Sequence, residues 1–352
     1  MAPLPVADDS AEDPVEDRAE DRAEDLVDGF GRVHRDLRIS VTDRCDFRCT
    51  YCMPEDGLDW VPRDEVLTYE EIARIATVMV KRFGVSSIRL TGGEPTVRAH
   101  LAELVSLLAP LGTDLSMTTN GASLDRLASP LRAAGLRRVN ISLDSLRRDR
   151  FERITRRDAL HHVLAGVDAA VAAGFAPVKV NVVLVAGVND DEIVDFARFG
   201  RDRGVTVRFI EYMPLDADGR WSGAEVVGRD RVLADIAAVF DLESIGRDHE
   251  PAARYRYTDR DPSSPGSEFG VVASVTTPFC DTCDRIRLTA EGQLRNCLFS
   301  LEETDLRSLL GTSSDAALVA AMRACVGAKR AGHGIGTATF IRPGRSMSQI
   351  GG

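Results

Sequence analysis

The sequence predicts an α/β fold, a partial TIM-type barrel of six βα units with a smaller α+β extension at the C-terminal end. From about residue 37 to residue 211, short β-branched apolar runs alternate with helical patterns, which is typical of a parallel sheet. After residue 213 this rhythm gives way to a loop rich in glycine and aspartate. A chain of 352 residues can also bury a substantial core without disulfides.

The six expected strands are short apolar runs at residues 37–41, 87–90, 115–118, 138–143, 178–184 and 206–210. Most of the segments between them carry apolar residues at helical spacing. Two of these segments, LDRLASPLRAAG and EIVDFARFGRDRG, end in glycine, as helices often do. A doubly wound open sheet has the same local pattern, so periodicity leaves that alternative open.

We expect three parts in the chain: a disordered acidic tail over residues 1–30, the barrel over 31–225 and a C-terminal region over 226–352. Residues 1–30 hold eleven acidic residues and two arginines, a charge of −9, so the remaining residues carry only −2 of the net −11. A segment with so much charge and so few apolar residues cannot offset the entropy of ordering.

Seven cysteines occur in a chain that shows neither a signal-peptide core nor a long apolar run. We therefore expect a cytoplasmic protein, with neither a membrane nor a nucleic acid as a partner. Cytoplasmic thiols stay reduced, so the cysteines are expected to hold metal, act as nucleophiles or fill the core. Cys325 lies on an apolar helical stretch and is expected in the core.

Cys45, Cys49 and Cys52 form a triplet, CDFRCTYC, in the loop after the first expected strand. Active sites of parallel α/β barrels gather at the carboxyl ends of the strands. Three thiolates on a four-iron cluster leave one iron free to bind a substrate. The alternative is a zinc site, which normally needs four ligands.

Cys280, Cys283 and Cys297 form a second triplet in the C-terminal region. A CX2C pair alone is also typical of a zinc knuckle or a redox pair. Beside the first triplet, a second [4Fe-4S] cluster with an open iron is the better interpretation.

Several segments resemble the radical S-adenosylmethionine (SAM) superfamily and, within it, the GTP 3',8-cyclase family, also called molybdenum cofactor biosynthesis protein A. The resemblance covers nearly all of residues 37–352. It is carried by LRISVTDRCDFRCTYCMP, IRLTGGEP, TTNG, RVNISLDSL, KVNVVLVAGVNDDEI, FIEYMP, CDTCDRIRLTAEGQLRNCLF and SMSQIGG.

The resemblance implies a radical reaction with two [4Fe-4S] clusters and SAM as cofactors. SAM on the first cluster would yield a 5'-deoxyadenosyl radical, while the second cluster would bind the guanine of GTP. Hydrogen removal from the ribose 3' carbon and addition of that carbon to C8 of the base would give a cyclised nucleotide.

The resemblance also implies site residues. Those expected to contact SAM are Tyr51, Gly93, Ser142 and Met213. Those expected to bind GTP are Arg38, Arg89, Thr119, Lys179, Arg285, Ile286 and Arg287, and the ones expected to be catalytic are Arg38, Arg285 and Arg287.

Physical chemistry supports part of this assignment. Arginine can fork to phosphate oxygens, and Arg285 and Arg287 alternate along a short strand, so they face the same side. Lys179 lies within an apolar strand, where a buried amine needs an anionic partner. At Gly93, the missing side chain lets strand-end backbone approach a ligand.

In the family the terminal double glycine enters the active site, so we expect the backbone and terminal carboxylate of Gly351 and Gly352 to reach inward and orient the arginines. The resemblance further implies cyclic pyranopterin monophosphate synthase as the downstream enzyme, a low-potential electron donor and a homodimer. Two alternatives remain open: a peptide-modifying radical SAM enzyme with an auxiliary cluster, and a non-enzymatic metal-binding or electron-transfer protein.

Overall fold

The computed structural model describes residues 23–216, 218–247, 250–311, 314–338 and 340–351. Most of the expected acidic tail, residues 1–22, lies outside the described residues. The predicted tail also includes residues 23–30, but this segment packs on the barrel. The Leu26 side chain is buried, and the Glu24 amide donates to the Arg82 carbonyl at 2.9 Å. The expected tail therefore extends too far into the chain.

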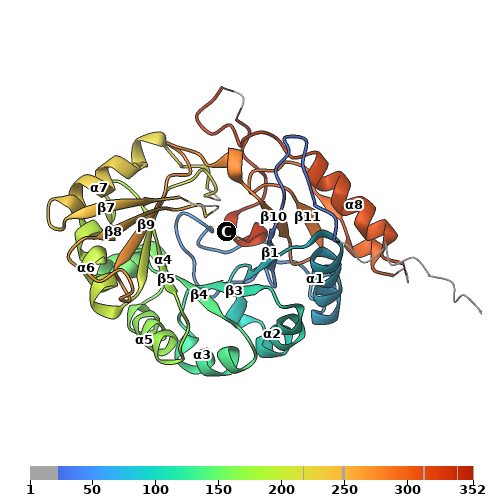
Figure 1. The fold of residues 1–352 in the computed structure, drawn as a ribbon, viewed down its shortest axis with the longest axis horizontal. Helices are drawn as coiled ribbons and strands as arrows, with labels where there is room; N and C mark the ends of the chain where they lie inside the picture. Colours follow the sequence, from blue (N-terminus) through green and yellow to red (C-terminus); the bar gives the residue numbers. More distant parts are fainter. Residues whose placement is uncertain (1–22, 217, 248–249, 312–313, 339, 352) are drawn as a thin grey trace, which may run out of the picture.

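Six parallel strands with outer helices form the body of the fold, as predicted (Figure 1). The strands are β1 (Asp36–Ser40), β2 (Ser87–Thr91), β3 (Asp114–Thr119), β4 (Arg138–Ser142), β5 (Val178–Leu184) and β6 (Thr206–Glu211). The helices that follow them are α1 (Tyr69–Phe83), α2 (Leu101–Leu108), α3 (Leu124–Ala133), α4 (Arg148–Thr155), α5 (Leu160–Ala172) and α6 (Ile193–Arg203). The strands neighbour one another in sequence order, which excludes the doubly wound alternative because that fold reverses direction.

Helix α1 shows how local sequence fixes these elements. Thr68 and Glu71 form a reciprocal capping box at its start, and Gly84 ends it in the left-handed conformation, with φ of 64°. Its apolar residues, including Ile72, Ile75 and Met79, are buried against the sheet. The core therefore lies between the strands and the outer helices.

The C-terminal region extends the same sheet at both edges and does not form a separate layer. Beyond β6 come β9 (Glu268–Val272), β8 (Ala253–Tyr257) and β7 (Leu242–Gly246). Beyond β1 come β10 (Arg285–Leu288), β11 (Gln293–Arg295) and β12 (Thr304–Asp305). Because β9 and β10 run parallel to β6 and β1, residues after the predicted boundary at 226 contribute to both sides of the barrel.

Three further helices complete the chain: α7 (Arg229–Ala237), α8 (Ala316–Gly327) and the short α9 (Met347–Ile350). Cys325 of α8 is buried in the main core, as predicted. The end of the chain turns back into the centre of the barrel (Figure 1). Within the described residues, no helix has the length and apolar character needed to cross a membrane.

Candidate active site

One cavity of about 270 Å³ brings most of the expected site residues together. The expected residues that line it are Arg38, Cys45, Cys49, Tyr51, Cys52, Arg89, Gly93, Thr119, Ser142, Met213, Cys280, Cys283, Arg285, Arg287 and Cys297. The first cysteine triplet ends at Cys52 and the second begins at Cys280, yet both face the same space because β10 joins the sheet beside β1.

The first triplet lies in the loop between β1 and α1, and its thiols are partly buried. The Phe47 amide points at Cys45 Sγ (3.4 Å), and the Cys52 amide donates to the Cys49 carbonyl (2.9 Å). Burial raises the pKa of the Cys45 and Cys49 thiols well above the usual range. It raises the pKa of Cys52 to about 11, despite hydrogen bonds from Ser348. Metal binding at this triplet would therefore displace protons.

Two glycines after β2 allow the cysteine loop to come close. A Cβ on Gly93 would lie 2.3 Å from the Arg44 carbonyl oxygen and 2.4 Å from that of Asp43. A Cβ on Gly92, where φ is 142°, would lie 2.3 Å from the Thr42 carbonyl oxygen. The close approach at Gly93 is thus to neighbouring backbone, a reason that the sequence could not supply.

Glu94, next in the same turn, is a site residue to which sequence reasoning assigned no role. Its buried carboxylate lines the cavity and accepts from Thr119 Oγ1 (2.7 Å), the Asn120 amide (2.5 Å) and the Thr96 amide (3.0 Å). Burial raises the pKa of Glu94, against these hydrogen bonds. Its position in the TGGEP motif was the available signal.

Tyr51 and Asp144 join the cysteine loop to the end of β4. The Tyr51 hydroxyl donates to Asp144 Oδ2 (2.5 Å), and the Val183 amide donates to Asp144 Oδ1 (2.8 Å). Burial raises the pKa of Asp144 to about 6. Ser142, at the end of the same strand, also lines the cavity.

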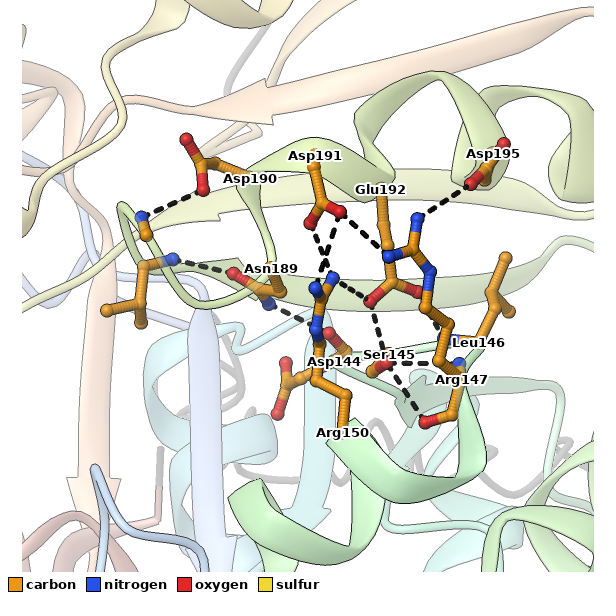
Figure 2. A network of polar contacts seen from close by, with 12 residues as sticks. Asp144, Ser145, Leu146, Arg147, Arg150, Asn189, Asp190, Asp191, Glu192 and Asp195 are labelled. Atoms are coloured by element: carbon orange, nitrogen blue, oxygen red, sulfur yellow. Dashed lines mark hydrogen bonds and ion pairs between the residues drawn. The ribbon is translucent and has the colours of Figure 1, made fainter.

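A network of polar contacts holds the loop after β4 from behind (Figure 2). Asn189 Nδ2 donates to the Asp144 and Val183 carbonyls, both at 2.8 Å, and its Oδ1 accepts from the Val185 amide at 2.8 Å. The Glu192 carboxylate accepts from Ser145 Oγ and from the Leu146 amide, both at 2.7 Å. The GVNDDE segment therefore fixes the loop that carries Asp144.

In the second triplet, Cys280 and Cys283 lie between β9 and β10 and Cys297 follows β11, and all three thiols are partly buried. The Phe299 amide points at Cys297 Sγ (3.4 Å), and Lys329 Nζ lies 3.6 Å from Cys283 Sγ. Burial alone would raise the pKa of Cys283, but the positive charges of Arg285 and Lys329 outweigh it and lower the pKa to about 7. This thiol is prepared for the thiolate form that metals bind.

Cations from adjacent strands point into the barrel. Arg38 on β1 is opposite Arg287 on β10 and Arg89 on β2, and all three line the cavity. Burial and repulsion from Arg89 and Arg287 lower the pKa of Arg38. Arg208 on β6 lines the cavity too, although sequence reasoning overlooked it. Its place in the apolar run TVRFI was the same signal that drew attention to Lys179.

Two expected GTP-binding residues do not line the cavity. The Ile286 side chain is fully buried in the main core, on the opposite face of β10 from its two arginine neighbours. Lys179 is buried in the barrel and pairs with Glu250 (Nζ to Oε1 3.0 Å). The anionic partner expected for this amine is thus a residue of the chain itself.

The C-terminal segment enters the barrel as expected for the described residues. Met347 and Ser348 line the cavity, and Arg287 donates to the Gly351 carbonyl. A Cβ on Gly351 would lie 2.6 Å from Thr91 Oγ1 and 2.7 Å from an oxygen of Ser40. The terminal carboxylate belongs to Gly352, which lies outside the described residues.

Several cavity-lining polar atoms are buried without a hydrogen-bond partner in the part of the chain that the structure describes. They are Arg38 Nε, Thr91 Oγ1, Asn181 Oδ1 and Ser274 Oγ. Buried polar groups are almost always paired, so these atoms fit a polar ligand that reaches deep into the barrel.

The chemistry of the donor sets fits iron–sulfur clusters. Over the described residues, no three histidine, cysteine, aspartate or glutamate side chains converge as ligands of a single metal ion would. An iron–sulfur cluster is held by thiolates, and each triplet supplies three, with a backbone amide directed at one sulfur.

Comparison with known proteins gives two family matches that together span most of the chain. Residues 39–200 match the radical SAM superfamily, and residues 205–335 match Molybdenum Cofactor Synthesis C.

Curated relatives match over nearly their whole length. A "GTP 3',8-cyclase 2" of Mycobacterium tuberculosis (strain ATCC 25618 / H37Rv) is 52% identical over 332 residues, 93% of this chain and 92% of the relative. A "GTP 3',8-cyclase" of Mycolicibacterium smegmatis is 48% identical and one of Rhodopirellula baltica 46% identical, each with 93% of this chain and 92% of the relative covered.

Proposed function

The chain belongs to the GTP 3',8-cyclase family of radical SAM enzymes, and from this we propose that it converts GTP into (8S)-3',8-cyclo-7,8-dihydroguanosine 5'-triphosphate. This reaction is the first step of molybdenum cofactor biosynthesis. The observation that carries the proposal is one cavity lined by both cysteine triplets and by buried arginines of the barrel strands.

The radical SAM family implies a [4Fe-4S] cluster and SAM, and Cys45, Cys49 and Cys52 would hold that cluster. When bound, SAM and the cluster supply the hydrogen abstraction from the ribose 3' carbon. Gly93, Ser142, Tyr51 and Met213 would contact SAM.

The side chains of this region position one another through hydrogen bonds. Tyr51, between Cys49 and Cys52 in the sequence, donates its hydroxyl to Asp144, and the Asn189 side chain donates to the Asp144 carbonyl. A prepositioned site lowers the entropic cost of aligning the reacting atoms.

Cys280, Cys283 and Cys297 would hold a second [4Fe-4S] cluster whose open iron binds the guanine. Support comes from their shared cavity with the first triplet and from Lys329, which places positive charge beside Cys283. Cationic surroundings favour the thiolate that iron needs.

The triphosphate would bind the cations of the barrel interior, namely Arg38, Arg89, Lys179 and the arginines of β10. Thr119 would add a hydroxyl contact. We assign the catalytic roles to Arg38, Arg285 and Arg287, which lie on the paired strands β1 and β10 and line the cavity. The Gly351 carbonyl would orient Arg287.

The reaction also needs partners. A low-potential reductant would supply the electron, and cyclic pyranopterin monophosphate synthase would consume the product. We further propose a homodimer, and a cytoplasmic location because six cluster thiols must remain reduced.

The test is anaerobic incubation of the reconstituted protein with dithionite, SAM and GTP deuterated at the ribose 3' position. We expect 5'-deoxyadenosine that carries the deuterium and a nucleotide of the cyclised mass. Deoxyadenosine without a GTP-derived product would contradict the cyclase assignment and favour the peptide-modifying alternative. Iron or zinc binding with no SAM cleavage would favour the non-enzymatic one.

A further inference from the structure

The barrel interior holds an excess of positive charge, most of it buried. Arg38, Arg89 and Arg287 are neighbours across three strands, and Lys179 and Arg208 follow on β5 and β6. Burial lowers the pKa of Arg208 to about 10 and that of Lys179 to about 7, and repulsion from Arg208 adds to the effect at Lys179. Buried like charges destabilise one another unless an anion compensates them.

One anion already compensates part of this charge. Lys179 Nζ donates to both carboxylate oxygens of Glu250, at 3.0 and 3.2 Å, and Arg208 donates to one of them. For the described residues, Glu250 is the only hydrogen-bond partner of the Lys179 ammonium and of the Arg208 guanidinium. Both cations thus depend on a single carboxylate.

Glu250 reaches these cations from outside the barrel strands. It precedes β8, and its side chain is 39% exposed, whereas the side chains of Lys179 and Arg208 are 11% and 7% exposed. Its neighbour Pro251 lines the cavity together with Arg208. The carboxylate therefore lies at the rim, where it can move to solvent, while the two cations are fixed on strands.

We propose that Glu250 is an internal counterion of the triphosphate site, which a polyphosphate must displace from Lys179 and Arg208 in order to bind. This inference rests on the proposed function, because it takes the barrel cations as the triphosphate site. A carboxylate oxygen and a phosphate oxygen make the same kind of charge-assisted hydrogen bond to these donors.

The exchange makes Glu250 a specificity-determining residue. A triphosphate offers several anionic oxygens and can replace one carboxylate with a net gain in contacts. Guanosine has no phosphate groups, so it cannot replace the Glu250 carboxylate and leaves its pairing with Lys179 and Arg208 intact. A ligand that binds Lys179 and Arg208 must first break their pairing with Glu250, and this cost weakens its binding. A ligand that does not contact these cations binds with unchanged affinity.

The experiment is anaerobic calorimetry on the reconstituted holoenzyme, with GTP, inorganic tripolyphosphate and guanosine as ligands. For Glu250→Gln we expect GTP and tripolyphosphate to bind about tenfold more tightly, since one charge-assisted pair no longer competes. Guanosine affinity should stay the same. Glu250→Asp keeps the charge on a shorter side chain, so its affinities for GTP and tripolyphosphate should lie between those of the wild type and of Glu250→Gln.

Glu268→Gln is the matched control. Glu268 also pairs with two arginines, Arg254 (3.0 Å) and Arg256 (3.0 Å), but on β9 and β8 away from the cavity lining. Its replacement should leave the affinity for all three ligands unchanged.

If the wild type binds GTP but Glu250→Gln binds GTP and tripolyphosphate no more tightly, the inference is overturned and the proposed function stands. An equal gain for guanosine would also overturn it. Failure of the wild type to bind GTP would instead overturn the proposed function, and the inference with it. If Glu250→Gln does not fold, Glu250→Asp decides by the same comparison.

Discussion

Gly93 lies where the turn after β2 crosses the cysteine loop after β1. Its amide donates to the Thr42 carbonyl (2.8 Å), and a Cβ there would overlap two backbone carbonyls. The position of the first triplet thus depends on the absence of one methyl group.

We expect Gly93→Ala to displace the cysteine loop, with a loss of about 1–3 kcal/mol in stability, typical of overpacking, and loss of the first cluster. Iron content and thermal unfolding measure both effects. Gly327→Ala is the control, because a Cβ at Gly327 meets no atom within 4 Å. Equal iron content in the two variants would count against this role.

His34 is fully buried and lies 2.9 Å from Lys329 Nζ and 3.7 Å from Asp28 Oδ2. Burial and the positive charge of Lys329 lower the pKa of His34 to about 4 from its usual 6.5, although Asp28 opposes the shift. The folded protein therefore keeps this ring neutral under mildly acidic conditions.

Between pH 6.5 and pH 4 the unfolded chain binds a proton at His34 that the folded chain does not. The free energy of unfolding should therefore fall as the pH falls through this window, by about 2 kcal/mol between pH 7 and pH 5. Urea unfolding of the wild type and His34→Gln at both pH values measures this contribution, which the variant should lack. An identical pH dependence would show that His34 titrates normally in the folded state.

At the scale of elements, the segment between β5 and α6 acts on the site through the loop after β4 (Figure 2). Asn189 is fully buried and satisfies three backbone groups. Asp191, two residues further on, pairs with Arg147 and Arg150 through a carboxylate that is about half exposed, and Arg150 has Glu192 as a second partner.

We expect Asn189→Ala to cost about 2–4 kcal/mol, because it leaves buried backbone groups unpaired, and to weaken SAM binding through Asp144. Asp191→Asn should cost less than about 1 kcal/mol, since exposed ion pairs contribute little. Chemical denaturation and calorimetry with SAM compare the two. A larger effect at Asp191 would contradict this account of the loop.

At the scale of the whole molecule, the N-terminal segment connects with the end of the chain around the second triplet. Arg32 is held by Asp28 (Nε to Oδ2 2.6 Å) and donates to the carbonyls of Cys280 (2.5 Å) and Ala331 (2.9 Å). Residues nearly 250 positions apart in the chain thus stabilise one loop.

Deletion of residues 1–22 should leave iron content and melting temperature unchanged. Deletion of residues 1–28 removes Leu26 and Asp28, so we expect a lower melting temperature and loss of iron from the second triplet. Iron analysis and thermal unfolding of both truncations test this. If the longer deletion keeps its full iron content, the N-terminal segment does not support this triplet.

The sequence by itself determined the six βα units, the two cysteine triplets and the family, because each is written in local periodicity or in short fixed spacings. It also indicated that Lys179 needs an anion, because an amine in an apolar strand cannot remain unpaired.

Only the tertiary structure decided which residues share the cavity. Strand β10 pairs beside β1, which brings the second triplet to the first, and β6 brings Arg208 to Lys179. It also identified Glu250 as the partner of Lys179 and placed Ile286 in the core. These placements depend on strand order and on packing between residues far apart in the chain, and local sequence patterns determine neither.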